Sequence, residues 1–194
     1  MIVGGGLLAS AFDAHAVDAV GATVFASGVS NSNEENRDAF AREERLLRHH
    51  LLSSHGAFVY FSTCSIDDPD RGRGAYAIHK AKMEKLVEER PDSLILRLPQ
   101  VVGRTKNPNT LTNYIARHIL EGLEFTIWKD ATRCLVDVEH VEKVTMHLLS
   151  REEERNITEQ IAPPETLSMA SLVALMESAL GRSALTRTIS RSGG

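Results

Sequence analysis

Short apolar runs alternate with helical segments along the first hundred residues, and this alternation limits the possible fold more than any other feature of the chain. The apolar runs lie at residues 2–3, 23–26, 58–61 and 94–98. The segments between them have the composition or spacing of helices and lie at residues 7–20, 34–52 and 75–89. Strands that alternate with helices form parallel sheets with right-handed crossovers. The sequence therefore predicts an α/β fold, a reduced parallel sheet flanked by helices.

The regular alternation of apolar runs and helical segments ends after Gly103. Helical spacing predicts helices near 110–122, around Val141, Val144 and Leu148, and from the expected N-cap at Ser168 onward. Short strands are expected at 125–127 and 134–136. We expect residues 1–104 to form the core and residues 105–194 a small C-terminal lobe, with the segment 133–150 returning to the core.

Composition excludes several classes of protein. The net charge of −4 provides no basic surface for nucleic acid. The sequence lacks an apolar run long enough to span a membrane, and it does not begin with the pattern of a signal peptide. Its two cysteines are 70 positions apart, and the eight histidines do not fall into metal-ligand spacing. These features predict a cytoplasmic protein without a metal site.

Three glycines follow the first apolar run. The segment Gly4-Gly5-Gly6-Leu7-Leu8-Ala9 fits the pattern G-x-G-x-x-A at the junction of a strand and a helix. Glycines there permit a tight turn and the close approach of a pyrophosphate, which makes the fold Rossmann-like. A merely flexible turn is the alternative. An acidic residue that would hold the adenosine ribose is expected about 20 positions on, but residues 22–30 contain none.

Tyr76 and Lys80 are spaced by four residues, so on a helix they share a face. A neighbouring ammonium favours the phenolate and lowers the pKa of a tyrosine from about 10. Tyr76 is therefore a candidate acid or base for a carbonyl/alcohol pair. The spacing is common, and a solvated lysine on an ordinary helix is the alternative.

Four further segments accompany this pair in a fixed order. They are Phe61-Ser62-Thr63-Cys64-Ser65, residues 96–103 (LRLPQVVG), residues 133–141 (RCLVDVEHV) and residues 163–168 (PPETLS). With the glycine turn, this set resembles the extended short-chain dehydrogenase/reductases of the NAD-dependent epimerase/dehydratase type. The resemblance covers nearly the whole chain. It implies a shortened member that lacks two strand–helix units after the first helix, where the family holds adenine and its ribose.

The resemblance implies a role for each matching residue. Thr63 would hydrogen-bond the reacting oxygen, Tyr76 would exchange its proton, and Lys80 would lower the pKa of Tyr76 and hold the nicotinamide ribose. Cys64 and Arg133 would contact the substrate, with Arg133 at a diphosphate; a surface ion pair is the alternative for Arg133, and a packed small residue for Cys64. The residues implied to contact NAD or NADP are Gly4, Gly6, Leu7, Leu8, Ala26, Ser27, Ser62, Tyr76, Lys80 and Pro99.

The resemblance implies an NAD(P)-dependent oxidoreductase or epimerase/dehydratase that acts on a nucleotide-activated sugar. The alternative is a non-catalytic relative that binds a ligand or a partner and has lost productive use of the cofactor, because the adenosine-binding part is missing. Members of the family often form dimers through the corresponding helices, so the resemblance also implies a homodimer packed through the helices expected at 34–52 and 75–89.

Overall fold

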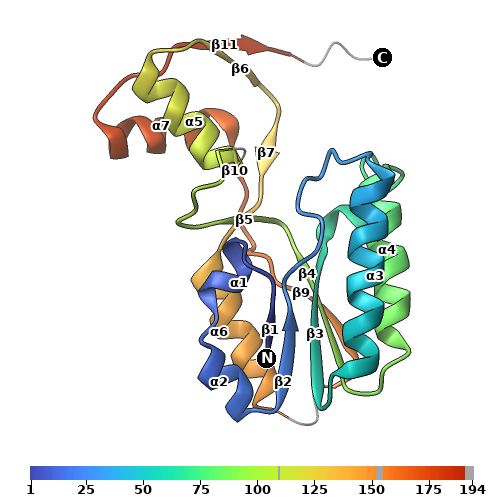
Figure 1. Cartoon of the computed structure of the whole chain (residues 1–194). Helices are drawn as coiled ribbons and strands as arrows, with labels where there is room; N and C mark the ends of the chain where they lie inside the picture. The colour runs from blue at the N-terminus through green and yellow to red at the C-terminus, as the bar shows by residue number, and fades with distance from the viewer. Residues whose placement is uncertain (109, 152–154, 191–194) are drawn as a thin grey trace. The chain divides into compact units, whose positions relative to one another are not determined.

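The computed structural model describes residues 1–108, 110–151 and 155–190 (Figure 1). The chain divides into two compact units. Unit 1 consists of Met1–Gly103 and Val136–Ile161, and unit 2 consists of Arg104–Leu135 and Ala162–Gly194. Unit 1 thus contains the glycine turn and the predicted catalytic residues Thr63, Tyr76 and Lys80.

The centre of unit 1 is a five-stranded sheet in which all neighbouring strands are parallel. In spatial order its strands are β1 (Ile2–Val3), β2 (Ala22–Phe25), β3 (Ala57–Thr63), β4 (Ser93–Leu98) and β9 (Ile157–Gln160). The register places Val24 opposite Val59 and Phe61 opposite Leu96. All seven residues of β3 are buried, as expected for a central strand covered on both faces. The predicted α/β fold with a parallel sheet is confirmed.

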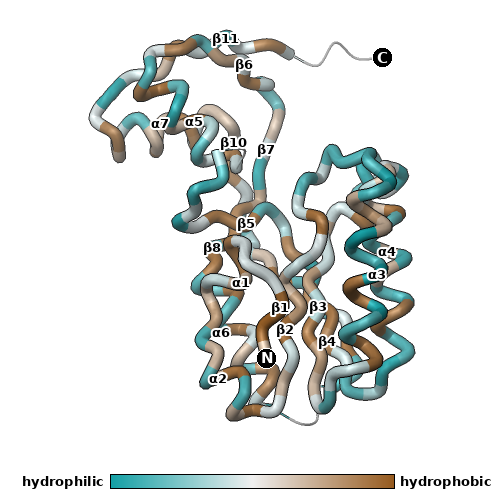
Figure 2. Tube along the Cα trace, in the orientation of Figure 1, coloured by the Kyte–Doolittle hydropathy of each residue, from teal (hydrophilic) through white to brown (hydrophobic). Residues whose placement is uncertain are grey.

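Helices cover both faces of this sheet (Figure 1). Helices α1 (Leu7–Ala11), α2 (Ala14–Ala19) and α6 (Val138–Leu149) pack on one face, and α3 (Arg37–Ser53) and α4 (Ala75–Glu88) on the other. Successive side chains of β3 alternate between the two cores, with Val59 and Phe61 facing α2 and α6, and Phe58 and Tyr60 facing α3 and α4. The apolar strands run between the more polar surfaces of α3 and α4 and the other helical layer (Figure 2).

The prediction of a single helix at residues 7–20 is wrong, because two short helices occupy this segment. Phe12 takes an extended conformation, and Asp13 begins α2 by accepting a hydrogen bond from the backbone of Ala16 at 2.8 Å. Aspartate competes for backbone donors in this way, which favours a helix start over a helix interior. The break also turns Phe12 into the core, where its ring lies 5.9 Å from that of Phe61.

Strand β1 forms an edge of the sheet, and β2, the next strand in the chain, pairs directly with it. The shortened sheet predicted from the sequence is therefore confirmed. Elsewhere in the described residues, β5 (Gln100–Val102) pairs with β8 (Leu135–Asp137) as a two-stranded sheet. The described residues thus form no sheet on the side of β1 where a full Rossmann fold holds the adenosine half of a dinucleotide.

Unit 2 has a small core of its own. Its elements are α5 (Leu111–Glu121), β6 (Phe125–Trp128), β7 (Thr132–Arg133), β10 (Leu167–Ser168), α7 (Met169–Leu180) and β11 (Thr186–Ile189). Helices α5 and α7 pack on β6 through Ile115, Ile119, Phe125 and Leu172. Strand β11 pairs with β6 in parallel, and β10 pairs with β7 antiparallel.

None of the helices in the described part of the chain is long and apolar enough to cross a membrane.

Candidate active site

The glycine turn lies between β1 and α1, against the chain that leaves β2. Gly4 has a φ of 132°, and a Cβ at this position would lie 2.4 Å from the backbone oxygen of Ala26. Such a contact is impossible without moving backbone, so residue 4 must be glycine. Gly5 and Gly6 have open space where a side chain would stand, and both are exposed. The turn thus offers uncovered backbone beside Ala26 and Ser27, as a bound pyrophosphate would need.

Two hydroxyl side chains lie at the carboxyl end of β3. Thr63 accepts a hydrogen bond from the backbone of Ser65 at 3.1 Å, which begins the short 3-10 helix η1 (Cys64–Asp67). Ser62 is 6% exposed, and its hydroxyl has no hydrogen-bond partner among the described residues. A buried hydroxyl without a partner costs about 1–3 kcal/mol. Ser62 therefore fits a site where a bound polar group completes its hydrogen bonding.

Tyr76 lies in the first turn of α4, with the Thr63 side chain close enough to its phenol to affect its pKa. The structure thus brings Tyr76, which is predicted to exchange a proton with the substrate oxygen, close to Thr63, which is predicted to hydrogen-bond that oxygen. Burial raises the pKa of Tyr76 to about 12; the hydrogen bond with Thr63 opposes this rise, and the nearby Glu43 carboxylate adds to it. The net pKa of Tyr76 is thus raised and not lowered, and the role of Lys80 in lowering it stays a prediction.

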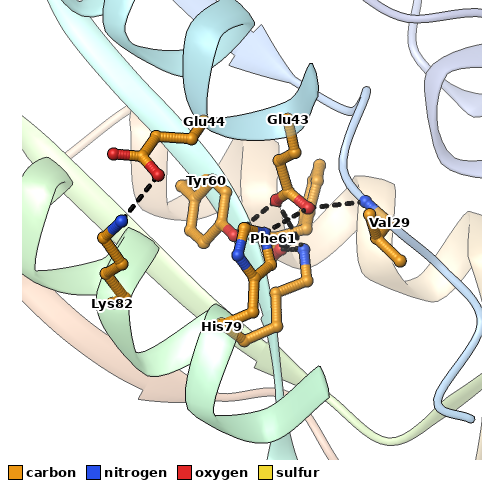
Figure 3. A network of polar contacts seen from close by, with 8 residues as sticks. Val29, Glu43, Glu44, Tyr60, Phe61, His79 and Lys82 are labelled. Carbon is orange, nitrogen blue, oxygen red and sulfur yellow. Dashed lines mark hydrogen bonds and ion pairs between the residues drawn. The ribbon is translucent and has the colours of Figure 1, made fainter. Parts of the chain in front are cut away.

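Burial is the largest cause of the raised pKa of Tyr76, and a smaller part comes from Glu43, a fully buried carboxylate (Figure 3). Its Oε1 accepts hydrogen bonds from the Tyr60 hydroxyl at 2.7 Å and from Lys80 Nζ at 3.0 Å. Its Oε2 accepts from the backbone of Val29 at 2.7 Å and lies 3.1 Å from His79 Nε2. Burial raises the pKa of Glu43, but these hydrogen bonds and the charge of Lys80 outweigh it and lower the pKa from 4.5 to about 2.

Lys80 directs all its protons into the protein. It is 3% exposed, and Nζ donates to Glu43, to the Tyr60 hydroxyl at 3.1 Å and to the backbone oxygen of Phe61 at 3.2 Å. Burial lowers the pKa of Lys80, and the carboxylate of Glu43 opposes that shift. An ammonium group has three protons, so in this arrangement none is left for a ribose hydroxyl. The role of Lys80 in holding the nicotinamide ribose stays a prediction that requires it to move.

The remaining predicted site residues lie at several places. Leu7 and Leu8 begin α1, and both are half-buried; Pro99 is half-buried between β4 and β5. Cys64 follows Thr63, with its Sγ 3.5 Å from the backbone oxygen of Arg97. Arg133 belongs to β7 in unit 2 and donates to the backbone oxygen of Thr132 at 2.8 Å. Their contacts with cofactor or substrate stay predictions.

Glu43 is the site residue that sequence reasoning missed. From the sequence alone, the charged segment 34–48 is most simply interpreted as a solvated helix face, and Glu43 lies within it. A signal was nevertheless present, because Glu43 follows Phe40 by three residues and precedes Leu47 by four. It therefore lies on the apolar side of α3, where a carboxylate needs buried donors.

The comparisons with known proteins agree with this geometry. The sequence model of the NAD dependent epimerase/dehydratase family matches residues 4–161. Among solved structures, RMD from Pseudomonas aeruginosa complexed with NADPH matches with a TM-score of 0.71 at 17% identity, over 89% of this chain and 69% of that one. No curated protein matches the chain.

Two further structures show the same fold. UDP-glucose 4-epimerase from Thermus thermophilus, in complex with NAD, matches with a TM-score of 0.71 at 15% identity, over 90% of this chain and 67% of that one. The dTDP-glucose 4,6-dehydratase from Bacillus anthracis, in complex with NAD, matches with a TM-score of 0.70 at 14% identity, over 91% and 63%. The chain spans about two thirds of these proteins. The match from residue 4 to residue 161, together with the glycine turn and the parallel sheet, shows that this chain belongs to the NAD dependent epimerase/dehydratase family.

Proposed function

We propose that this chain is an NAD(P)-dependent oxidoreductase or epimerase/dehydratase that acts on a nucleotide-activated sugar through Thr63, Tyr76 and Lys80. The proximity of the Thr63 and Tyr76 side chains at the carboxyl end of β3 carries the proposal. Ligands of open parallel sheets bind outside this end of the strands. The structural neighbours include MoeE5 in complex with UDP-glucose and NAD, which supports a nucleotide sugar as substrate.

The residues of unit 1 fit the nicotinamide half of a dinucleotide. The glycine turn of Gly4 and Gly6 would face the pyrophosphate, and the partnerless hydroxyl of Ser62 would receive a hydrogen bond or donate one. When bound, the nicotinamide supplies a hydride acceptor or donor. Residues 22–30 contain no acid for the adenosine ribose, and β1 has no further strand beside it in the described residues. The adenosine half would therefore be held by other groups than in a full Rossmann sheet.

The protein side of the chemistry is proton exchange. A sugar hydroxyl or carbonyl oxygen at the Thr63–Tyr76 pair would accept a hydrogen bond from Thr63 and exchange a proton with the Tyr76 phenol. With a pKa of about 12, the phenol keeps its proton at neutral pH. In this state Tyr76 is prepared to donate a proton to an oxygen that becomes negatively charged, which is general acid catalysis.

A second candidate function is a non-catalytic relative that binds a ligand or partner. The full engagement of Lys80 by Glu43, Tyr60 and Phe61 favours it, because the lysine has no proton free for a cofactor. The edge position of β1 favours it too.

The proposed homodimer and the cytoplasmic location stay predictions. Exposed apolar side chains on both helices of the expected interface support the dimer, with Leu52 of α3 89% exposed and Ile78 of α4 59% exposed.

Direct binding of the cofactor tests the proposed function against the second candidate. Calorimetry with NAD, NADH, NADP and NADPH is expected to show micromolar binding of one oxidised and reduced pair. Replacing Ser62 with alanine should weaken this binding about three- to tenfold, because the cofactor would lose its hydrogen bond with the buried Ser62 hydroxyl. The matched control is Ser53→Ala, at the end of α3, where the hydroxyl bonds only the backbone of His49 among the contacts described. Failure of all four dinucleotides to bind would favour the non-catalytic relative.

A further inference from the structure

The strand order of the central sheet never reverses. From one edge to the other the strands are β1, β2, β3, β4 and β9, which is also their order along the chain. A full Rossmann sheet consists of two mononucleotide-binding halves that extend in opposite directions from its first strand, and the dinucleotide lies across the point of reversal. The sheet formed by the described residues therefore has the architecture of one half alone.

The far side of β1 is an open edge, where the other half of a Rossmann sheet would lie. Residues 4–21 connect β1 to β2 and contain only the glycine turn and the short helices α1 and α2. Among the described residues, β1 hydrogen-bonds with β2 alone. The connection between these two strands thus contains none of the strands that would meet the adenosine half of a dinucleotide.

The backbone after β2 turns away from this open edge. A Cβ at Gly28 would lie 2.6 Å from Lys80 Nζ, and the next residue, Val29, donates its N–H to the Glu43 carboxylate at 2.7 Å (Figure 3). Because Lys80 Nζ also donates to a backbone oxygen of β3, this backbone lies toward β3 and not beside β1. Residues 22–30 contain no acid either. A ribose beyond β1 would therefore meet neither the strand end nor the carboxylate that a full Rossmann sheet provides.

The groups that fit a bound nucleotide lie on the half that is present. The exposed glycines Gly4 and Gly6 leave uncovered backbone at the carboxyl end of β1. Two strands away, Ser62 at the carboxyl end of β3 has a buried hydroxyl that no described residue partners. Such a hydroxyl needs a bound group that completes its hydrogen bonding. These groups extend from β1 to β3, so the contacts that they offer end at the glycine turn and do not continue past β1.

We propose that the cofactor site of this chain recognises a single mononucleotide, the nicotinamide ribose phosphate, and that the adenosine half of NAD(P) contributes little to binding. The inference rests on the proposed function, whose cofactor it concerns. The adenosine half meets only groups that a full Rossmann sheet does not use. In a full sheet, the hydrogen bond from the adenosine ribose to a carboxylate contributes about ten- to a hundredfold to affinity. Loss of this contribution leaves the mononucleotide and the dinucleotide with similar affinities.

Calorimetry with reduced nicotinamide mononucleotide tests the proposal. Its dissociation constant is compared with that of NADH or NADPH, whichever binds more tightly. The proposal predicts a ratio below about ten, which is the least that one hydrogen bond to a carboxylate contributes, and a larger ratio would overturn it. AMP, titrated over the concentrations that saturate the mononucleotide, is expected to give no heat of binding. A measurable affinity for AMP would show that the adenosine half is recognised, and the proposal would then be wrong.

Replacement of Ser62 by alanine shows whether the two ligands occupy the same site. Both should bind more weakly by the same factor, about three to ten, because Ser62 lies on the half that both ligands use. Ser53→Ala is again the control, since its hydroxyl bonds only the backbone of His49 among the contacts described. A loss of affinity confined to the dinucleotide would place the mononucleotide elsewhere and contradict the proposal.

The same measurements separate this proposal from the proposed function. If a dinucleotide binds and the mononucleotide binds more weakly than this limit allows, the proposed cofactor stands and the single-mononucleotide site is excluded. If neither a dinucleotide nor the mononucleotide binds, the proposed function and this proposal fail together. Similar affinities of the mononucleotide and a dinucleotide, both reduced by Ser62→Ala, support both.

Discussion

Replacement of Glu43 by alanine is expected to lower the free energy of unfolding by about 3–5 kcal/mol. The substitution leaves the Lys80 ammonium buried without its counter-charge, and it removes the acceptor of the Tyr60 hydroxyl and of the Val29 backbone. Urea unfolding at neutral pH, followed by circular dichroism, measures the difference. The matched variant Glu44→Ala should change stability by at most about 1 kcal/mol, because its ion pairs with Arg48 and Lys82 lie at the surface. Equal effects of the two substitutions would contradict the role of the buried network.

The same carboxylate predicts how stability depends on acid. The pKa of Glu43 is about 2 in the folded protein and 4.5 without the fold. Its contribution to stability is therefore fully present above pH 4.5 and is lost as the pH falls toward 2. The contribution corresponds to about 3 kcal/mol for this shift. In Glu43→Ala the free energy of unfolding should decline less over this interval than in the wild type, and an identical decline would show that another group is responsible.

Replacement of Tyr76 by phenylalanine is expected to reduce turnover of a nucleotide sugar by about 10²–10⁴-fold, because proton exchange with the substrate oxygen is lost. The change removes only the phenol oxygen beside Thr63, so stability should fall by at most about 1 kcal/mol. Product analysis by mass spectrometry measures turnover, and thermal unfolding measures stability. Tyr114→Phe is the control, since Tyr114 lies on α5 in unit 2 and is 38% exposed. Full turnover by Tyr76→Phe would exclude the proton-exchange role.

The fold could be predicted from the sequence because its signals are local. Runs such as residues 58–61 and 94–98 are apolar throughout, as strands buried on both faces are. The glycine turn was equally visible, although only the structure shows that Gly4 meets the backbone of Ala26, which is 22 positions away. The break at Asp13 was not foreseen, because the alanine-rich composition of residues 7–20 favours a helix and the capping preference of a single aspartate opposes it.

The charge balance of the site could not be predicted, because it depends on partners far apart in the chain. The spacing of Tyr76 and Lys80 places both on one face of a helix, but it does not say which acid meets the lysine. Glu43 reaches Lys80 across 37 positions, and only the packing of α3 against α4 brings them together. The spacing alone led to the expectation of a lowered Tyr76 pKa, whereas burial of the phenol, with a smaller part from the Glu43 carboxylate, raises it.

Transfer of deuterium between the nicotinamide ring and a nucleotide sugar tests the central claim most directly. The wild-type protein would be incubated with a dinucleotide carrying deuterium at C4 of its reduced nicotinamide and with a panel of UDP-, dTDP- and GDP-linked keto sugars. Mass spectrometry then follows the label. The account predicts deuterium in one sugar product and its loss from the nicotinamide. A dinucleotide that binds but never transfers its label to any sugar of the panel would contradict the proposed activity and favour a binding protein built on the family's fold.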